Sequence, residues 1–181
     1  MHMKKTFILF LLPLCFAACT GSTSDTKATA GNDSLTASPP APLPYTAAYS
    51  SNFVPGKQAD VLTVLNNYKT WETNDMKAMR ATLGDTVTME FPAGMRVTKQ
   101  ADSLIKMATL FRDSLSNVSL TLYAWTSNHS VDKNEDWVNV WYKEVDTYKT
   151  GKVDSVYYED DNKLKDGKIV LTSSHSQKIL K

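Results

Sequence analysis

The spacing of apolar residues changes along the chain and divides it into helical and extended segments. In residues 59–73 and 99–114, apolar side chains recur every three or four positions, as they do on one face of a helix. Between these segments, Asp75 is suited to cap a further short helix over residues 76–83. The pattern therefore predicts three helices in this part of the chain.

Apolar and polar residues alternate in the remaining segments, which is typical of strands. Short strands are expected at residues 86–91 and 95–97, and longer ones at residues 118–127, 137–148, 153–158 and 169–176. Short connections favour antiparallel neighbours. The order of elements predicts an α+β fold, with the helices packed on one face of a curved sheet.

The first 18 residues are expected to be a signal peptide. Lys4 and Lys5 precede a mostly apolar run that is too short to span a bilayer but suits a secretory signal. The string Phe16-Ala17-Ala18-Cys19 resembles the bacterial lipobox, in which the cysteine is acylated and becomes the mature N-terminus. The resemblance implies lipidation of Cys19 and anchoring to a membrane. Ordinary cleavage after Ala18, leaving a free thiol, is the alternative.

Residues 19–56 are expected to be a disordered tether. They are rich in Ser, Thr, Ala and Pro and show neither a helical nor a strand period, so burial cannot offset the entropy of ordering them. Residues 57–181 are then the folded module. Together with the lipobox, this organisation predicts a bacterial cell-envelope lipoprotein, on the periplasmic side or at the outer-membrane surface.

Charge and cysteine content exclude several classes of protein. Among 181 residues, 20 are Lys or Arg and 19 are Asp or Glu, so the net charge of +1 gives no reason to expect a nucleic-acid partner. The two cysteines, Cys15 and Cys19, both lie near the N-terminus, which rules out a disulfide scaffold and a cysteine zinc site. Asp132, Asn134 and Asp136 imitate the start of a calcium loop, but Trp137 replaces the required glycine. No metal or cofactor is expected.

Three strings give the module a family resemblance. They are residues 67–71 (Asn-Tyr-Lys-Thr-Trp) leading to Asn74-Asp75, residues 86–92 (Thr-Val-Thr-Met-Glu-Phe-Pro) and residues 165–170 (Lys-Asp-Gly-Lys-Ile-Val). In this order they resemble the nuclear transport factor 2-like superfamily, especially its SnoaL-like branch. The resemblance implies a cone with a strongly bent antiparallel or mixed sheet, an apolar pocket between sheet and helices, and a homodimer formed through the sheet.

The same resemblance indicates which positions would carry catalytic residues in this chain. Members similar to ketosteroid isomerases carry an Asp immediately before the proline that ends the first strand, but this chain has Phe91 there and its acid at Glu90. This departure counts against the isomerase mechanism. The candidate catalytic residues are Glu159 or Asp161 as a base, Tyr68 as a hydrogen-bond donor, and His129. The competing interpretations are a solvated hairpin end for the acids, a core tyrosine and an exposed strand-end histidine.

Aromatic residues dominate the expected pocket. Its predicted lining is Tyr68, Trp71, Phe91, Phe111, Trp125, Trp141 and Tyr157. The leading hypothesis is a membrane-anchored module that binds a small apolar or amphipathic molecule, or a partner, without catalysis. The alternative is a SnoaL-like isomerase, cyclase or dehydratase that transfers a proton on a carbonyl compound. A third hypothesis is a structural dimer whose cavity is filled by its own Trp and Met side chains.

Overall fold

The computed structural model describes residues 43–178, all of which belong to a compact unit that begins at Leu43. The predicted signal peptide, the lipidated Cys19 and the tether as far as residue 42 lie outside the described residues. They stay predictions.

Three helices form in the first half of the unit, as the periodicity predicts. They are α1 (Gln58–Thr73), α2 (Met76–Thr82) and α3 (Ala101–Arg112), and a short 3-10 turn, η1, covers Pro92–Gly94. Helix α1 ends at Asn74, which adopts the left-handed conformation with φ 60° that asparagine tolerates. The carboxylate of Asp75 then accepts a hydrogen bond from the amide of Ala78, so it caps α2 as expected.

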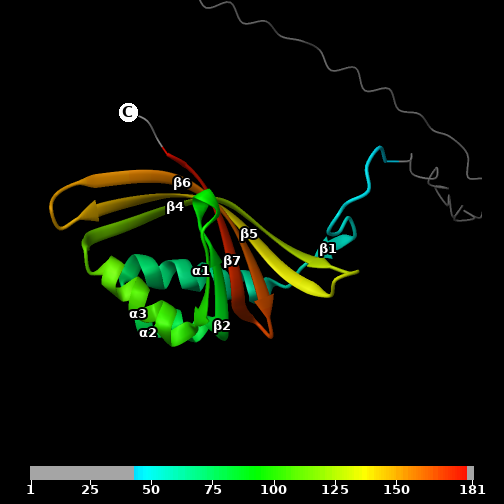
Figure 1. Cartoon of the computed structure of the whole chain (residues 1–181), viewed down its shortest axis with the longest axis horizontal. Helices are drawn as coiled ribbons and strands as arrows, with labels where there is room; N and C mark the ends of the chain where they lie inside the picture. Colours follow the sequence, from blue (N-terminus) through cyan, green and yellow to red (C-terminus); the bar gives the residue numbers. More distant parts are fainter. Residues whose placement is uncertain (1–42, 179–181) are drawn as a thin grey trace, which may run out of the picture. The chain divides into compact units, whose positions relative to one another are not determined.

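Seven strands form one mixed sheet (Figure 1). They are β1 (Phe53–Pro55), β2 (Leu83–Glu90), β3 (Arg96–Gln100), β4 (Leu115–Ser130), β5 (Glu135–Tyr148), β6 (Val153–Lys165) and β7 (Lys168–Lys178). Their order across the sheet is β1-β4-β5-β6-β7-β2-β3. All neighbours are antiparallel except β2 and β7, which are parallel.

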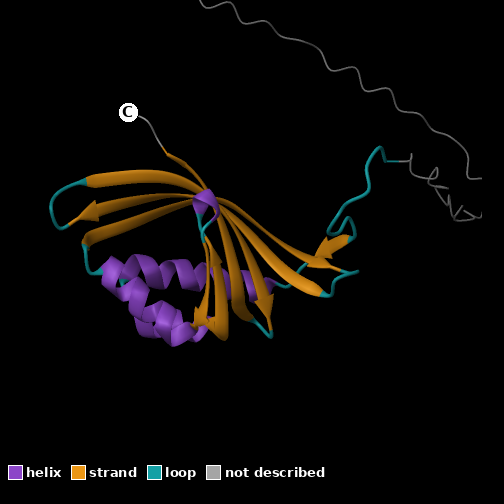
Figure 2. Ribbon diagram, viewed as in Figure 1, coloured by secondary structure: helices purple, strands orange, loops and turns teal. Residues whose placement is uncertain are grey.

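The sheet is strongly bent, and α1, α2 and α3 all lie on one side of it (Figure 2). The predicted α+β cone, with three helices and a mixed sheet, is therefore confirmed. We call the side of the sheet that faces the helices the inner face, and the opposite side the outer face.

The end of the expected tether joins the sheet. Phe53, Val54 and Pro55 pair with Ser130, His129 and Asn128 of β4, and Tyr49 hydrogen-bonds to Glu135. Three residues that include a proline carry no alternation to read in the sequence, and a proline is tolerated on an edge strand because its missing N–H is not needed there. The compact unit thus starts within the segment that the sequence assigned to the tether.

Strand β6 is longer than its sequence pattern indicated. The expected strand stopped at Tyr158, because the polar run Glu159–Lys163 favours a hairpin end. In the structure β6 continues to Lys165, and this run pairs with β5 on one side and β7 on the other. The extension brings Asp160 and Asn162 into the interior.

The main core lies between α1 and the inner face. Its buried members are Val61, Val64, Tyr68, Val138, Val140, Tyr142, Leu164 and Ile169. A second, smaller core of Val87, Ala101 and Leu104 lies between α3 and β2. The helices are therefore held to the sheet by apolar burial, the main favourable term in folding.

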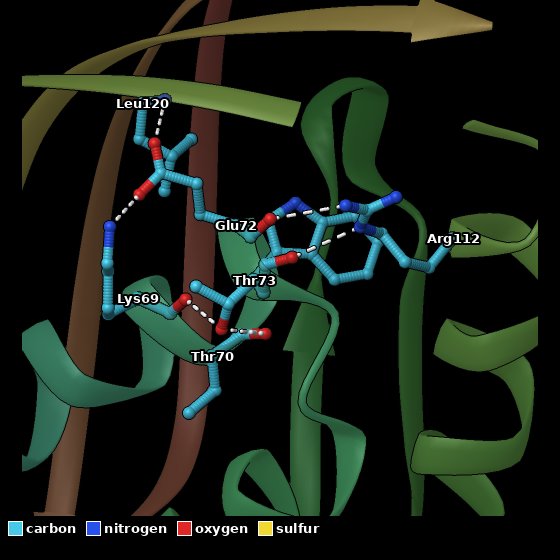
Figure 3. Close-up of polar contacts among 7 residues, drawn as sticks. Lys69, Thr70, Glu72, Thr73, Arg112 and Leu120 are labelled. Carbon is cyan, nitrogen blue, oxygen red and sulfur yellow. Dashed lines mark hydrogen bonds and ion pairs between the residues drawn. The ribbon is translucent and has the colours of Figure 1, made fainter. Parts of the chain in front are cut away.

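The C-terminal end of α1 is fixed by polar contacts (Figure 3). The guanidinium of Arg112, from α3, donates to the carbonyls of Trp71 at 3.1 Å and Glu72 at 3.2 Å in the last turn of the helix, where carbonyls lack full helical pairing. The Trp71 carbonyl also accepts from the amide of Asn74 at 3.2 Å. The Glu72 carboxylate accepts from Lys69 at 2.7 Å and from the amide of Leu120 at 3.2 Å, and both hydrogen bonds lower its pKa. These contacts join α1 to α3 and β4.

Candidate functional site

Four polar side chains from α1, β5 and β6 meet in the middle of the main core. The hydroxyls of Tyr68 and Tyr142 both donate to Oδ2 of Asp160, at 2.8 and 3.0 Å. Asn162 donates to the Tyr68 hydroxyl at 3.2 Å and accepts from the hydroxyl of Thr172 at 2.8 Å. Asp160 is only 3% exposed. We call Tyr68, Tyr142, Asp160 and Asn162 the interior cluster.

Burial shifts the acids of the interior toward their neutral forms. It raises the pKa of Asp160, against hydrogen bonds from both tyrosines that lower it. Burial likewise raises the pKa of Tyr68 and of Tyr142, with the Asp160 charge adding to each. Glu144 lies nearby on β5, and its pKa rises to about 8, mainly through burial, although the Trp71 indole donates to it at 2.9 Å. Glu144, with its pKa of about 8, can therefore exchange a proton near neutral pH.

The interior cluster is packed closely by aromatic rings. The ring of Tyr142 lies 5.0 Å from that of Tyr68 and is stacked 5.3 Å from that of Tyr158, measured between centroids. None of the cluster residues lines either of two hollows on the surface of the described residues, of about 390 and 290 Å³. A substrate would therefore reach Asp160 only if these rings moved.

The structure separates the predicted catalytic residues. Tyr68 belongs to the interior cluster, whereas Glu159 and Asp161 point to the outer face, on either side of Asp160 along β6. His129 bonds through Nδ1 to Asp136 at 2.8 Å, and Asp136 also binds Lys57 at 2.8 Å. None of the other candidates, Glu159, Asp161 and His129, therefore lies next to Tyr68.

Sequence reasoning missed Asp160, although a signal was present. Strand alternation places Tyr158, Asp160, Asn162 and Leu164 on one face, with Tyr158 and Leu164 marking that face as apolar. The three adjacent acids concealed this pattern, because such a run is more often solvated.

Two of the expected pocket-lining residues pack against each other at the end of α1. The ring of Trp71 stacks on that of Phe111 with centroids 6.1 Å apart and planes 3° apart. Of the others, Phe91 lines a hollow on the sheet, and Trp125 and Tyr157 are 47% and 42% exposed. Trp141 is half-buried on the outer face, where it is opposite Ala124 of β4 and Glu159 of β6.

The larger hollow, of about 390 Å³, lies on the outer face, where the tether meets the sheet. Three aromatic residues and three polar ones line it: Tyr49, Phe53, Trp137, Asn128, Asn139 and Asp161. The Tyr49 ring meets the Trp137 ring edge-on, at 6.3 Å and 89°. We call it the aromatic hollow.

The polar side of the aromatic hollow is a chain of side-chain hydrogen bonds across three strands. Asn128 of β4 donates to Oδ1 of Asn139 at 3.0 Å, and Asn139 of β5 donates to Asp161 of β6. Each of the three side chains keeps unused bonding capacity, because an amide or carboxylate can make three or four hydrogen bonds. The hollow thus offers flat apolar rings on one side and hydrogen-bonding groups on the other.

The second hollow, of about 290 Å³, lies toward the other edge of the sheet. Its lining is Glu90, Phe91, Pro92, Ala93, Gly94, Arg96, Ser173, Ser174 and His175. Arg96 pairs with Glu90 at 3.1 Å. Ala93 and Gly94 in η1 have φ of 70° and 84°, so the chain turns sharply at the wall of this second hollow.

Residues 43–178 contain neither a metal-type cluster nor a helix that could span a membrane. In this range, no three His, Cys, Asp or Glu side chains are grouped so that they could hold a metal ion. No helix of the described part is long and apolar enough to cross a membrane.

Comparison with known proteins identifies similar structures but no similar sequence. No family model matches the chain, and no curated protein matches it. Among solved structures, an LEH-like epoxide hydrolase of M. tuberculosis aligns with a TM-score of 0.57 and 11% identity, over 66% of this chain and 83% of that one.

Two further structures give the same result. An NTF2-like protein from Anabaena variabilis has a TM-score of 0.56 and 12% identity, and the alignment covers 70% of this chain and 96% of that one. A putative polyketide cyclase from Xanthomonas campestris has a TM-score of 0.52 and 18% identity, over 65% and 89%. At this level of identity the likeness establishes the fold, and function has to be argued from the site.

Proposed function

This chain has the nuclear transport factor 2-like fold, and we propose that its module binds a small amphipathic molecule, without catalysis, as part of a membrane-anchored envelope lipoprotein. The observation that carries the proposal is the aromatic hollow. Its volume of about 390 Å³ falls in the range of small-molecule sites, roughly 300 to 1,000 Å³. The sequence placed the pocket on the inner face, and we now propose the outer face instead.

The lining of the aromatic hollow suits a ligand with one apolar and one polar side. The rings of Tyr49, Phe53 and Trp137 bury apolar surface, and such rings supply much contact area at little conformational cost. Asn139 and Asp161 can orient the polar side, because each keeps free acceptor or donor positions. Of the two hollows, neither is lined by the interior cluster.

Binding can be tested with a neutral amphipathic dye. We would titrate Nile red into the full chain carrying Cys19→Ser, so that no lipid or detergent competes for the dye. We expect a saturable rise in fluorescence, and Trp137→Ala should weaken binding about tenfold, since loss of a stacked ring costs about 1 kcal/mol or more.

Trp125→Ala is the matched control for this titration. The Trp125 side chain is 47% exposed, more than the half-buried Trp137, but it is opposite Val140 on the inner face and does not line the hollow. Equal losses in the two variants, or dye fluorescence that does not saturate, would contradict the proposal.

Anchoring through Cys19 has its own test. When the wild-type chain is produced in a bacterium with a lipoprotein pathway, it should partition into the detergent phase of Triton X-114 and incorporate labelled palmitate. The Cys19→Ser variant should do neither. Unchanged partitioning of Cys19→Ser would remove the anchor from the proposal and leave the binding site untouched.

A catalytic function is the second candidate, and one observation favours it. Two tyrosine hydroxyls converge on the same oxygen of a buried carboxyl, Asp160, whose pKa burial raises. A carboxyl of this kind can take a proton from the carbon next to a carbonyl group and return it, while a tyrosine donates to the carbonyl oxygen. The solved structures that resemble this one include, by their names, an epoxide hydrolase and a putative polyketide cyclase.

Hydrogen–deuterium exchange separates the two candidates. If Asp160 is a working base, the protein should accelerate exchange of the α-protons of cyclohexanone in D₂O, followed by NMR. Asp160→Asn should abolish the acceleration, and Asp161→Asn should not. If wild type and Asp160→Asn give the same rate as buffer, Asp160 is a structural acid and the binding function stands alone.

A further inference from the structure

One row of polar side chains crosses the outer face and connects the two hollows. In the register of the sheet, successive members lie directly opposite one another: Thr126, Asn139, Asp161, Ser173, Glu90 and Arg96. Side chains that lie opposite each other on neighbouring strands point to the same face. The outer row therefore runs perpendicular to the strands, from β4 to β3.

The outer row is long compared with either hollow. It makes five steps between adjacent strands of the order β4-β5-β6-β7-β2-β3, which at about 4.8 Å each gives about 24 Å. Asn139 and Asp161 of the row line the aromatic hollow, and Glu90, Arg96 and Ser173 line the second hollow. Because Asp161 and Ser173 lie directly opposite each other on β6 and β7, the two hollows adjoin and form one continuous surface.

The outer row holds three charged residues, Arg96, Glu90 and Asp161, and carries a net charge of about −1. Arg96 pairs with Glu90 at 3.1 Å, and His175 lies 4.0 Å from the carboxylate of Asp161. A strongly charged ligand would find no concentrated charge of the opposite sign on the row, because Arg96 is already paired with Glu90 and Asp161 is a single acid. Charge complementarity therefore favours an uncharged ligand that is rich in hydroxyl groups.

Aromatic rings stand at both ends of this polar row. Tyr49, Phe53 and Trp137 line the first hollow and Phe91 the second. A sugar ring has C–H groups on its faces and hydroxyls around its edge, so it matches flat rings combined with amide and carboxylate groups.

We propose that the outer row binds an uncharged oligosaccharide that lies across the strands, with one sugar ring against Trp137 and a later one in the second hollow. The proposal rests on the proposed function, because the aromatic hollow is the same site, and it names the class of ligand. An extended peptide would instead add to an edge strand, β1 or β3, through main-chain hydrogen bonds.

The first experiment measures the dependence of binding on chain length. The full chain carrying Cys19→Ser is titrated by calorimetry with mono-, di-, tetra- and hexasaccharides of glucose, N-acetylglucosamine, mannose and galactose, all uncharged. For at least one of these series, we expect the hexasaccharide to bind at least tenfold more tightly than the disaccharide, because only a longer chain reaches both hollows. Absence of binding in all four series would overturn the proposal.

Variants then locate the ligand on the surface. Trp137→Ala should weaken binding of every length about tenfold, and Asn139→Ala should weaken it several-fold. Phe91→Ala should affect the hexasaccharide and leave the disaccharide unchanged, which a folding defect would not do. Trp125→Ala, on the inner face, should change neither. If Phe91→Ala weakens binding of the disaccharide and the hexasaccharide equally, the two hollows do not form one site.

The outcomes distinguish this proposal from the proposed function and from the expected dimer. If Nile red binds and no oligosaccharide does, the glycan proposal falls and the binding function stands. If neither binds, both fall. The predicted homodimer through the sheet would cover the same face. Light scattering that shows a stable dimer, which Asn139→Ala converts to monomers, together with no sugar binding, would assign the face to a second copy instead.

Discussion

The two faces of β6 use the same kinds of residue for different purposes. Asp160 and Asn162 point inward and are almost completely buried, and both hydrogen-bond to the hydroxyl of Tyr68. Asp161 and Glu159 point outward beside Asn139, His175 and water-accessible aromatic rings. Burial turns the inner acid into a group whose proton is hard to remove, whereas solvent leaves the outer acids free to bind a ligand. One strand thus carries both candidate sites, and the alternation of side chains separates them.

The pH dependence of stability should show the largest difference between the faces. Glu144 has a pKa of about 8 in the folded state, above its ordinary 4.5, so the folded protein holds a proton that the unfolded chain releases. Stability should therefore fall as the pH rises from about 5 to about 8, by roughly 3 kcal/mol. The measurement is the free energy of unfolding in urea, for wild type and Glu144→Gln, at several pH values in this range. In the variant, this free energy should depend much less on pH. An equal pH dependence in the two proteins would show that burial does not shift the pKa of Glu144.

Removing the carboxyl of Asp160 should have the next largest effect. Asp160→Ala leaves the hydroxyls of Tyr68 and Tyr142 buried without an acceptor, which should cost about 2 kcal/mol or more in the free energy of unfolding. Asp161→Ala, the neighbouring acid on the outer face, should cost less than about 0.5 kcal/mol. If the two variants lose equal stability, burial does not distinguish the inner acid from the outer one.

The tyrosine hydroxyls give a smaller version of the same comparison. Tyr142→Phe removes one of the two donors to Asp160 and should cost about 1 kcal/mol. Tyr157→Phe removes the hydroxyl of a residue that is 42% exposed, so it should be neutral within error. Thermal unfolding at pH 7 measures both, and an equal loss in Tyr157→Phe would mean that burial does not decide how much these hydroxyls contribute.

The exposed ion pair at the end of the outer row should contribute least. Arg96→Met removes the partner of Glu90 and should lower stability by less than about 0.5 kcal/mol, with the difference vanishing in 1 M salt, because exposed pairs are weak and screened. A larger loss that salt did not remove would indicate that the second hollow is held more rigidly than its exposure implies.

Most of the fold could be predicted from the sequence, and the site could be predicted only in part. The three helices and the order of the six larger strands followed from periodicity, because each element must turn one apolar side to the core. Strand β1 and the second half of β6 did not follow. Strand β1 is a triplet that ends in proline and is too short to show alternation, and the run Glu159–Lys163 has little preference for strands on its own. Both are strands because neighbouring strands supply the hydrogen bonds.

The candidate residues divide in the same way. Tyr68 could be picked out because it lies near the position of the first-helix tyrosine in similar isomerases, and the structure places it in the interior cluster. Its partner Asp160 could not, because the decision between Asp160 and its two acidic neighbours depends on how far β6 extends.

By itself, the sequence determined the elements, their order and the α+β class, since periodicity is a local property of the chain. Only the tertiary structure decided which of three consecutive acids is buried and that Asn139, Asp161, Ser173 and Glu90 form one row. These facts depend on strand register, including the parallel pairing of β2 with β7, two segments far apart in the chain. Register is fixed by burying one face of every strand at once, and no single segment carries that information.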